Sequence, residues 1–334
     1  MPKKTKYKNL LLIGGAGYIG SSMMRDYIKN KNITGINCLD KLIYSNQTID
    51  KKIFKIKKYK FFNGDFRDRK ILDRSLKKVT DVVILAGLVG DPITKKYKSL
   101  GYDINLRAIK KLMNHLSNQK NIRKVLFIST CSNYGIVKNK IADEKTKLSP
   151  KSSYAIAKVE IEKFLLKKKK SFCSVILRFS TAFGLSPRMR YDLTVNEFCK
   201  YAHEGDNLVV YDAETWRPYC HVKDFSRIVL KVLMSPDHIV NNQVFNVGSN
   251  KLNYRKRDIV KFIKKHKKKL KVTYLKKKID PRNYRVNFKK LEKVLKIKPI
   301  FSAEYGIKEI VKNLTMNKKV SLDIGNYKIK NSVK

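Results

Sequence analysis

Asn9-Leu-Leu-Leu-Ile-Gly-Gly-Ala-Gly-Tyr-Ile-Gly20 is the stretch that decides how this chain folds. Its apolar run, residues 10–13, has the length of a buried strand, and apolar residues at helical spacing follow Gly20. Strand, glycine turn and helix in this order are typical of the phosphate-binding corner of a doubly wound α/β domain. Gly14 allows the tight turn, and Gly17 lets backbone N–H groups approach an anion at the helix N-terminus. The alternative is a tight turn that binds no ligand.

The next predicted strand favours a dinucleotide at that corner. This strand, Gly35-Ile-Asn-Cys-Leu-Asp40, ends in a carboxylate that stands 20 residues after Gly20. A carboxylate at this place accepts hydrogen bonds from the adenosine ribose hydroxyls, which favours NAD over NADP. Lys41 follows directly, and a cation there would favour a 2′-phosphate instead. We predict NAD as the cofactor.

Further strands alternate with helices along the first two thirds of the chain. We expect strands over 59–63, 81–86, 124–129, 175–179 and 245–248, with one long helix over 97–118. This alternation predicts a parallel sheet with right-handed crossovers. Residues at or just past the ends of two of these strands would then lie beside the cofactor, namely Asp65, Phe66, Leu85, Ala86 and Gly87.

A candidate catalytic group follows the strand over 124–129. Tyr154 and Lys158 are four residues apart at the start of a predicted helix, so their side chains share one helix face. A lysine cation beside a tyrosine favours the phenolate, which can take a proton from a sugar hydroxyl. The Thr130 hydroxyl would share the hydrogen bonds around the reacting oxygen. In a chain so rich in lysine, this tyrosine–lysine spacing also arises by chance, and its position after the strand argues against chance.

With these motifs in place, the chain resembles the NAD-dependent epimerase/dehydratase family of extended short-chain dehydrogenases/reductases, which act on nucleotide-activated sugars. The resemblance runs from Gly14 to about Pro299. It implies that Tyr154 is the catalytic base, Lys158 its partner and Thr130 the catalytic hydroxyl residue. Dehydratases of this family carry Asp-Glu where this chain has Cys131-Ser132, which argues against a 4,6-dehydratase. The cofactor-binding residues that we predict are Gly14, Gly17, Tyr18, Ile19, Asp40, Lys41, Asp65, Phe66, Leu85, Ala86, Gly87, Tyr154 and Lys158.

The resemblance also implies where the substrate binds. We expect contacts to the nucleotide or its diphosphate from Arg188, Arg190, Asn196, Arg217 and Arg282, with a solvated basic loop as the alternative for the first three. A guanidinium forks onto phosphate oxygens, which suits Arg217 to a diphosphate. The implied substrate is a UDP-, GDP- or dTDP-linked sugar oxidised at a ring carbon, most simply C4. The chain would form a homodimer, and no metal is expected.

Composition sets the remaining expectations. The chain has 334 residues, 43% of them hydrophobic, and a formal net charge of +49. The excess is mostly lysine spread along the chain, and no basic block carries interleaved aromatic residues. We therefore expect no dedicated nucleic-acid partner. Five scattered cysteines without a C-x-x-C pair and no apolar run of membrane-spanning length favour a cytoplasmic protein without a membrane partner.

The predicted fold class is α/β, a doubly wound parallel sheet (Rossmann-type) with a smaller C-terminal α/β substrate domain. We expect an NAD-binding domain over 1–184 that takes back short segments near 218–250, a substrate domain over 185–317 and a flexible tail over 318–334. The predicted function is an NAD-dependent nucleotide-sugar epimerase or dehydrogenase. A non-catalytic NAD-sensing member of the same superfamily and a basic nucleic-acid-binding protein are the alternatives.

Overall fold

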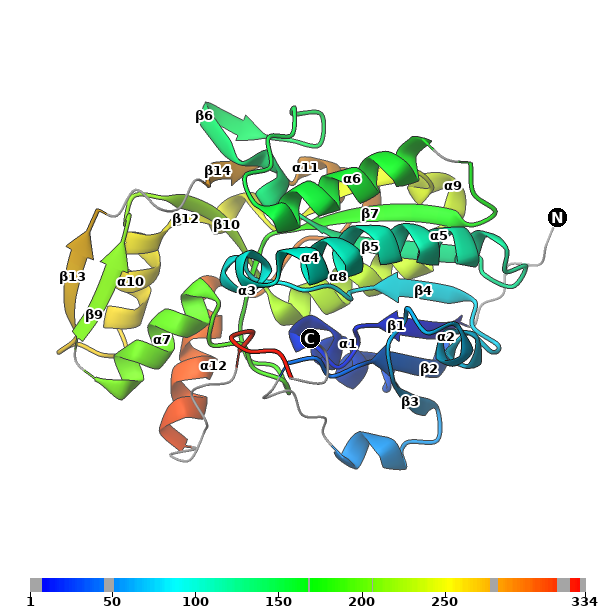
Figure 1. Ribbon diagram of the computed structural model, residues 1–334. Coiled ribbons are helices and arrows are strands. Elements are labelled where there is room, and N and C mark those ends of the chain that lie inside the picture. The colour runs from blue at the N-terminus through cyan, green and yellow to red at the C-terminus, as the bar shows by residue number, and fades with distance from the viewer. Residues whose placement is uncertain are drawn as a thin grey trace.

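A seven-stranded parallel sheet forms the centre of the computed structural model, which describes residues 8–44, 51–167, 169–205, 207–276, 282–316 and 325–330 (Figure 1). The strand order is β11-β7-β5-β4-β1-β2-β3, and every neighbouring pair is parallel. The predicted parallel sheet is confirmed. Its strands are β1 (Lys8–Ile13), β2 (Ile33–Asp40), β3 (Tyr59–Asn63), β4 (Asp81–Ile84), β5 (Lys124–Thr130), β7 (Cys173–Phe179) and β11 (Gln243–Val247).

Helices cover both faces of this sheet, as the continuous apolar runs of its strands require. Leu10 and Leu12 of β1 belong to the core on one face, whereas Leu11 and Ile13 belong to the core on the other. Because successive strand residues point to opposite faces, each strand supplies both cores. The first face is covered by α1 (Tyr18–Tyr27) and α8 (Val222–Met234), and the second by α2 (Arg69–Ser75), α5 (Ile109–Ser117) and α6 (Ser153–Lys167).

The long helix expected over 97–118 is interrupted. After α3 (Asp91–Lys96) the chain forms α4 (Lys98–Tyr102), then a π-helical turn over Asp103–Ala108, and only then α5. Asn105 lies in this turn, and its amide binds the loop after β4: Oδ1 accepts from Leu88 N at 2.8 Å, and Nδ2 donates to Leu88 O at 2.9 Å. Local hydrophobic periodicity does not reveal such a turn, which is mostly found near functional sites.

Elements mainly from the second half of the chain, together with β6, form a separate group at one end of the sheet (Figure 1). A three-stranded sheet has the order β12-β10-β8, and two parallel pairs are β9 with β13 and β6 with β14. The strands are β6 (Ile136–Ala142), β8 (Thr181–Phe183), β9 (Asn207–Tyr211), β10 (Trp216–His221), β12 (Asn253–Arg255), β13 (Lys271–Leu275) and β14 (Asn283–Val286). The helices of this group are α7 (Thr194–Glu204), α10 (Lys256–Lys264) and α12 (Ala303–Met316), whereas α9 (Asp237–Val240) contacts β7 and α11 (Lys289–Leu295) contacts β11 of the central sheet.

Part of the expected flexible tail is packed against the body of the protein. Ile329 is 5% exposed and pairs with Tyr44 in an antiparallel bridge, and Asn326 is 7% exposed. Residues 325–330 therefore differ from the expectation, because they bury side chains against a loop more than 280 positions earlier in the sequence. The predicted tail residues 318–324 and 331–334 lie outside the described ranges.

Three further observations concern chemistry and membranes. All five cysteines are buried and unpaired. In the described ranges, no group of three or more His, Cys, Asp or Glu residues has an arrangement that would hold a metal ion. None of the helices described here has the length and apolar character needed to cross a membrane.

Candidate active site

The glycine turn joins β1 to α1 at the carboxyl end of the sheet. Gly14 has a φ of 79°, and a Cβ on this residue would lie 2.6 Å from the backbone N of Ala86. The turn therefore packs directly against the residues that follow β4. Gly17 occupies the N-cap position of α1, so no N-cap side chain binds the N–H groups of this helix end. The N–H groups of the first turn of α1 are consequently available to an anion.

The carboxylate at the end of β2 is fixed beside this turn. Asp40 Oδ2 accepts a hydrogen bond from Ala16 N at 3.0 Å, and Oδ1 accepts one from Leu42 N at 2.8 Å. Each carboxylate oxygen has a second lone pair, so Asp40 retains the capacity to accept from ribose hydroxyls. Lys41 turns to Asp65, with 3.4 Å between Nζ and Oδ2. This pairing partly neutralises the cation that would otherwise favour a 2′-phosphate.

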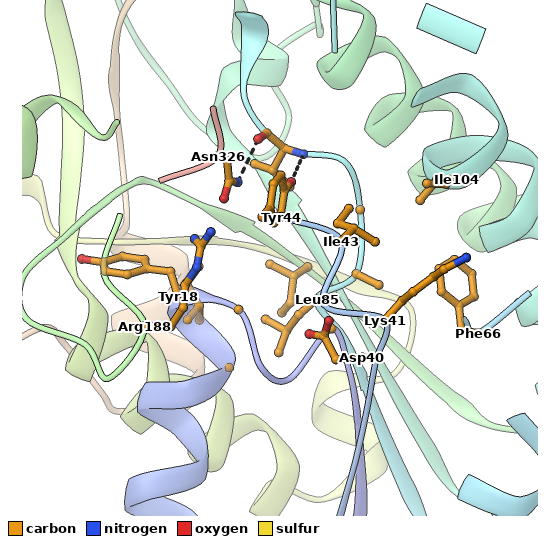
Figure 2. A pocket seen from close by; sticks show the side chains of 18 of the residues that line it. Tyr18, Asp40, Lys41, Ile43, Tyr44, Phe66, Leu85, Ile104, Arg188 and Asn326 are labelled. Atoms are coloured by element: carbon orange, nitrogen blue, oxygen red, sulfur yellow. Dashed lines mark hydrogen bonds between the residues drawn. The ribbon is translucent and has the colours of Figure 1, made fainter. Parts of the chain in front are cut away.

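One cavity brings together all of the predicted cofactor residues. Figure 2 shows Asp40 and Leu85 in its lower part, Tyr18 and Arg188 on one side, and Lys41 and Phe66 on the other. Two predicted substrate residues, Arg188 and Arg190, line the same cavity. The predicted residues that line it are Gly14, Gly17, Tyr18, Ile19, Asp40, Lys41, Asp65, Phe66, Leu85, Ala86, Gly87, Tyr154, Lys158, Arg188 and Arg190.

Tyr154 and Lys158 reach this cavity from the first turns of α6. Lys158 Nζ donates to Ile128 O at 2.7 Å, and it lies 5.6 Å from the centroid of the Tyr154 ring. The Lys158 side chain is buried, at 3% exposure. Burial lowers the pKa of Lys158 to about 7, and the negative charge of Glu162 one helical turn later opposes this shift. The lysine charge is therefore sensitive to small changes in its surroundings near neutral pH.

The hydroxyl of Thr130 forms a local hydrogen bond, and its catalytic role stays a prediction. Thr130 ends β5, and its Oγ1 accepts a hydrogen bond from Ser132 N at 3.1 Å. Thr130 is not among the residues that line the cavity. Its oxygen still carries a proton that it can donate. In this structure Thr130 caps the turn over Cys131–Tyr134, which is a structural role that the sequence analysis missed.

A buried hydrogen-bonded ion pair supports the loop after β5. Arg178 of β7 binds Glu162 of α6 through two nitrogens, with Nη2 to Oε2 at 2.6 Å and Nε to Oε2 at 3.0 Å. Ser129 Oγ and Asn133 Nδ2 donate to Glu162 Oε1 at 2.5 and 2.8 Å. Arg178 Nη1 also donates to the hydroxyl of Tyr134 at 2.9 Å. This network connects β5, α6 and β7, and its Glu162 lies one helical turn after Lys158 on α6.

The loop after β8 packs on the N-terminal turn of α1. The Tyr18 hydroxyl donates to Gly184 O at 2.5 Å, and Ser186 Oγ donates to Tyr18 O at 2.6 Å. Asn196 is fully buried: its Oδ1 accepts from Gly184 N, while its Nδ2 donates to Tyr18 Oη and Arg190 O. Three hydrogen bonds hold the Asn196 amide in this loop, and Asn196 does not line the cavity, so its substrate contact stays a prediction.

Arg217 and Arg282 are not among the residues that line the cavity. The Arg217 guanidinium is 5.3 Å from the centroid of the Tyr284 ring, and its Nη1 donates to Trp216 O at 2.8 Å and to Arg282 O. The Tyr284 hydroxyl lies 3.5 Å from Ser132 Oγ. These two arginines are therefore next to the loop after β5 and are not lining residues of the dinucleotide cavity. The predicted substrate arginines thus divide into two separate pairs.

Comparison with known proteins identifies the family. The sequence profile described as "NAD dependent epimerase/dehydratase family" matches residues 10–248. The chain belongs to this family. An uncharacterized UDP-glucose epimerase of Bacillus subtilis is 29% identical over 253 residues, which cover 72% of this chain and 76% of that protein. A UDP-glucose 4-epimerase of Lactobacillus helveticus is 32% identical over 161 residues, which cover 47% of this chain and 46% of the relative.

Solved structures of other family enzymes share the fold. UDP-glucuronic acid 4-epimerase from Bacillus cereus, in complex with UDP-glucuronic acid and NAD, superimposes with a TM-score of 0.82 at 22% identity. The superposition covers 92% of this chain and 99% of that one. dTDP-glucose 4,6-dehydratase from Bacillus anthracis, in complex with NAD, gives a TM-score of 0.79 at 24% identity over 93% and 98% of the two chains. At these identities the likeness establishes the fold.

The cavity of this family member fits NAD. A side chain at Gly14 would collide with the backbone of Ala86, so the turn keeps a cradle in which backbone alone meets the ligand. The uncapped N-terminus of α1 would supply donors for a pyrophosphate, and Asp40 would supply an acceptor for the adenosine ribose. Tyr154 and Lys158 line the same cavity. The family assignment and this geometry agree on NAD as the cofactor.

Sequence reasoning missed several lining residues. Tyr44 lies on the loop after β2, and its hydroxyl accepts a hydrogen bond from Val89 N at 3.0 Å. Asn326 comes from the C-terminal segment, beyond the residues that match the family profile. No local pattern in the sequence marks either residue, because each reaches the cavity only through long-range packing. The other missed lining residues are Gly20, Leu39, Ile43, Gly64, Val89, Ile104, Ile128 and Ala182.

Proposed function

We propose that this family member oxidises a ring carbon of a nucleotide-activated sugar, with C4 as the reacting carbon and Tyr154 as the base. The observation that carries this proposal is that Tyr154 and Lys158 line the same cavity as the glycine turn and Asp40. Bound NAD would accept the hydride that the sugar carbon gives up. The Tyr154 phenolate would take the hydroxyl proton, and the Lys158 ammonium would favour the phenolate by its charge.

The outcome of the oxidation is either epimerisation or net dehydrogenation. If the oxidised sugar is reduced again from its other face before it leaves, the product is the C4 epimer. If it leaves oxidised, the enzyme is a dehydrogenase. Several relatives are named UDP-glucose 4-epimerases, which favours epimerisation of a UDP-sugar, while GDP- and dTDP-sugars belong in the same test. Arg217 and Arg282 are our candidates for the substrate diphosphate, because guanidinium groups bind phosphate oxygens.

We further propose that the enzyme is not a 4,6-dehydratase, although some relatives carry that name. Loss of water needs acidic and basic groups next to the tyrosine, and the loop after β5 offers Cys131 and Ser132 instead of carboxylates. The Cys131 thiol is 1% exposed and donates to Arg178 O at 3.2 Å, and burial raises its pKa. A buried neutral thiol is a poor proton donor or acceptor at neutral pH.

The test compares the unmodified protein with Tyr154→Phe on a panel of UDP-, GDP- and dTDP-sugars. Reduced cofactor is followed by absorbance and the product by mass spectrometry and chromatography. We expect turnover by the unmodified protein and a fall of roughly 10²–10⁴ in the variant, which is the range of general acid–base catalysis. Tyr201→Phe is the control, because Tyr201 is 45% exposed on α7. Near-normal turnover in Tyr154→Phe would exclude this tyrosine as the base.

Other results of the same panel separate the alternatives. NAD binding without turnover of any sugar would favour a non-catalytic sensor. Release of a 4-keto-6-deoxy sugar would show a dehydratase and refute the preceding proposal. Binding to nucleic acid that survives high salt would revive the nucleic-acid alternative, since non-specific phosphate binding weakens steeply with salt.

We keep three further expectations as proposals. The first is a boundary near Gly184 between an NAD-binding domain and a substrate domain. β11 and α8, which follow this boundary, return to the N-terminal sheet and its helices. A homodimer is the second, and light scattering on the purified protein measures it. Cytoplasmic location is the third, and cell fractionation measures it.

A further inference from the structure

The described C-terminal segment, Gly325 to Lys330, returns to the dinucleotide cavity. Lys330 N donates to Ile43 O at 2.9 Å, next to the bridge between Ile329 and Tyr44. Ile329 packs in a small core with Tyr44, Leu88 and Ile93. The segment is thus attached both to the loop after β2 and to the chain after β4, and both of these line the cavity.

Asn326 presents an unused acceptor at this cavity. Its Nδ2 donates to Val89 O at 2.9 Å (Figure 2), and its backbone N donates to Asp192 Oδ1 at 3.2 Å. The first bond orients the side chain and the second holds the backbone of this residue, which is 7% exposed. Its Oδ1 is buried and has no hydrogen-bond partner. An unsatisfied buried acceptor costs free energy, and a ligand hydroxyl would remove that cost.

Arg188 presents an unused donor and an uncompensated charge beside it. The side chain is 3% exposed, its Nη2 donates to Gly325 O at 3.1 Å, and its Nε is buried without a partner. Figure 2 shows its guanidinium between Tyr18 and Tyr44. Among the described residues Arg188 has no carboxylate within ion-pair distance, whereas Arg190 is paired with Asp192 at 2.5 Å. Burial lowers the pKa of Arg188 to about 10, and the charge of Arg190 adds to this shift.

The position of Arg188 favours an anion at the N-terminus of α1. Its backbone N donates to Ser21 Oγ at 3.3 Å, so the residue lies against the first turns of that helix. The helix N-terminus carries a partial positive charge and unpaired N–H groups. A buried cation without a counter-ion is unfavourable, and a pyrophosphate at the helix N-terminus would supply the missing negative charge. Two independent features, the helix end and the buried guanidinium, therefore call for the same ligand group.

We propose that Arg188 and the C-terminal segment complete the cofactor site: Arg188 binds the dinucleotide pyrophosphate, Asn326 Oδ1 accepts a hydrogen bond from a ribose hydroxyl, and together they slow cofactor release. This inference rests on NAD binding in the cavity, and it moves Arg188 from the substrate to the cofactor. Gly325 O already holds the guanidinium in place, so the C-terminal segment and the pyrophosphate would share this one side chain. The segment would then retain NAD between turnovers.

The experiment measures how fast NAD leaves the full-length protein. The protein is loaded with NADH, the excess is removed, and the loss of protein-enhanced cofactor fluorescence is followed after adding a large excess of NAD. We expect Arg188→Met and Asn326→Leu each to raise the dissociation rate, Arg188→Met by about tenfold or more, as expected for losing a hydrogen bond to a charged group. Arg25→Met is the matched control, since Arg25 is an exposed residue of α1, the helix against which Arg188 packs. It should release NADH at the unmodified rate.

The binding of ligand fragments identifies the chemical group of the cofactor that Arg188 contacts. Arg188→Met should weaken ADP about as much as NAD and leave adenosine unchanged, because adenosine has no phosphate. Arg188→Lys keeps the charge but loses the planar guanidinium, so its affinity for ADP and NAD should lie between those of the unmodified protein and Arg188→Met. It also serves as the test protein if Arg188→Met does not fold, which circular dichroism and thermal melting would reveal.

Three results would overturn the proposal. Unchanged cofactor release in the folded Arg188 and Asn326 variants would refute it while leaving the proposed function intact. An increase in the KM for the nucleotide sugar with unchanged NAD release would return Arg188 to the substrate. Failure of the unmodified protein to bind NAD or NADH would instead refute the cofactor assignment itself, and this inference with it.

Discussion

Glu162→Gln is the substitution that most directly tests how the fold supports the candidate catalytic residues. It removes one charge from the buried pair with Arg178 and changes the side-chain volume little. Glu162 is 1% exposed and Arg178 4% exposed, so the arginine would stay buried without its counter-ion. The new amide would also place donors near Ser129 and Asn133, which already donate to this side chain.

The magnitude follows from this burial. Breaking a buried ion pair by removing one partner costs about 3–5 kcal/mol. For a chain of this length the unfolding entropy is roughly 0.7 kcal/mol per degree, so the Tm should fall by roughly 4–7 °C. Calorimetry measures this, with Glu160→Gln as the control, because Glu160 forms only a surface pair with Lys163 on the same helix. The double variant Glu162→Gln with Arg178→Met should recover part of the loss, because neither charge is then left unpaired.

The same substitution predicts a shift in the pH profile. Burial lowers the pKa of Lys158 to about 7, and the Glu162 charge acts to raise it. Removing that charge destabilises the ammonium, so the pKa of Lys158 should fall further and the ammonium should be lost at lower pH. If the Lys158 cation is needed for turnover, the alkaline limb of kcat should move to lower pH in Glu162→Gln and stay in place in Glu160→Gln. A Tm within one degree of the unmodified protein, or an alkaline limb that moves upward, would refute this reasoning.

Three further predictions concern other parts of the molecule. Asp40→Ala should weaken NAD binding and relax the rejection of NADP, measured by fluorescence titration; tighter binding of NADP by the unmodified protein would identify Lys41 as the dominant group. Arg217→Ala should raise the KM for the nucleotide sugar more than it lowers kcat, since phosphate contacts persist from the ground state to the transition state; a large fall in kcat alone would contradict this. Burial would raise the pKa of Glu309, but hydrogen bonds from His221, Lys223 and Leu185 N lower it to about 2. Its stabilising effect is therefore complete above about pH 4.5 and is lost as the pH falls toward 2, so Glu309→Gln should lower the Tm at neutral pH and match the unmodified protein in strong acid.

The sequence predicts the sheet and the cofactor side of the cavity because both depend on local patterns. A short apolar run followed by glycine defines β1 and its turn, and a carboxylate at the end of the next strand places Asp40. Since parallel strands end at one edge of the sheet, residues after successive strands must meet there. Each of the thirteen predicted cofactor residues does line the cavity.

The rest of the site depends on contacts between distant segments. We expected Asn196 to contact the substrate, but its amide is hydrogen-bonded to Gly184, Tyr18 and Arg190. Residue spacing in the sequence does not reveal these contacts. Asn326 lies 237 positions after Val89, to whose backbone it is hydrogen-bonded, and its segment shows no helical or strand periodicity. The π-helical turn at Asn105 also involves a contact between distant segments, because the Asn105 side chain binds the backbone of Leu88.

The high positive charge and the buried charges of the cavity act on different steps. Surface lysines create a field that is screened within about 10 Å at 0.1 M salt, so they can speed the arrival of any anion but cannot select one. Selection between anions must come from groups that hold the ligand at hydrogen-bond distance in a buried site. In our proposal Asp40 disfavours a 2′-phosphate. Arg190 is paired with Asp192, whereas Arg188 is a buried guanidinium whose Nε has no hydrogen-bond partner. The association rate of NAD should therefore fall with salt, whereas its dissociation rate, which depends on the buried contacts, should change much less.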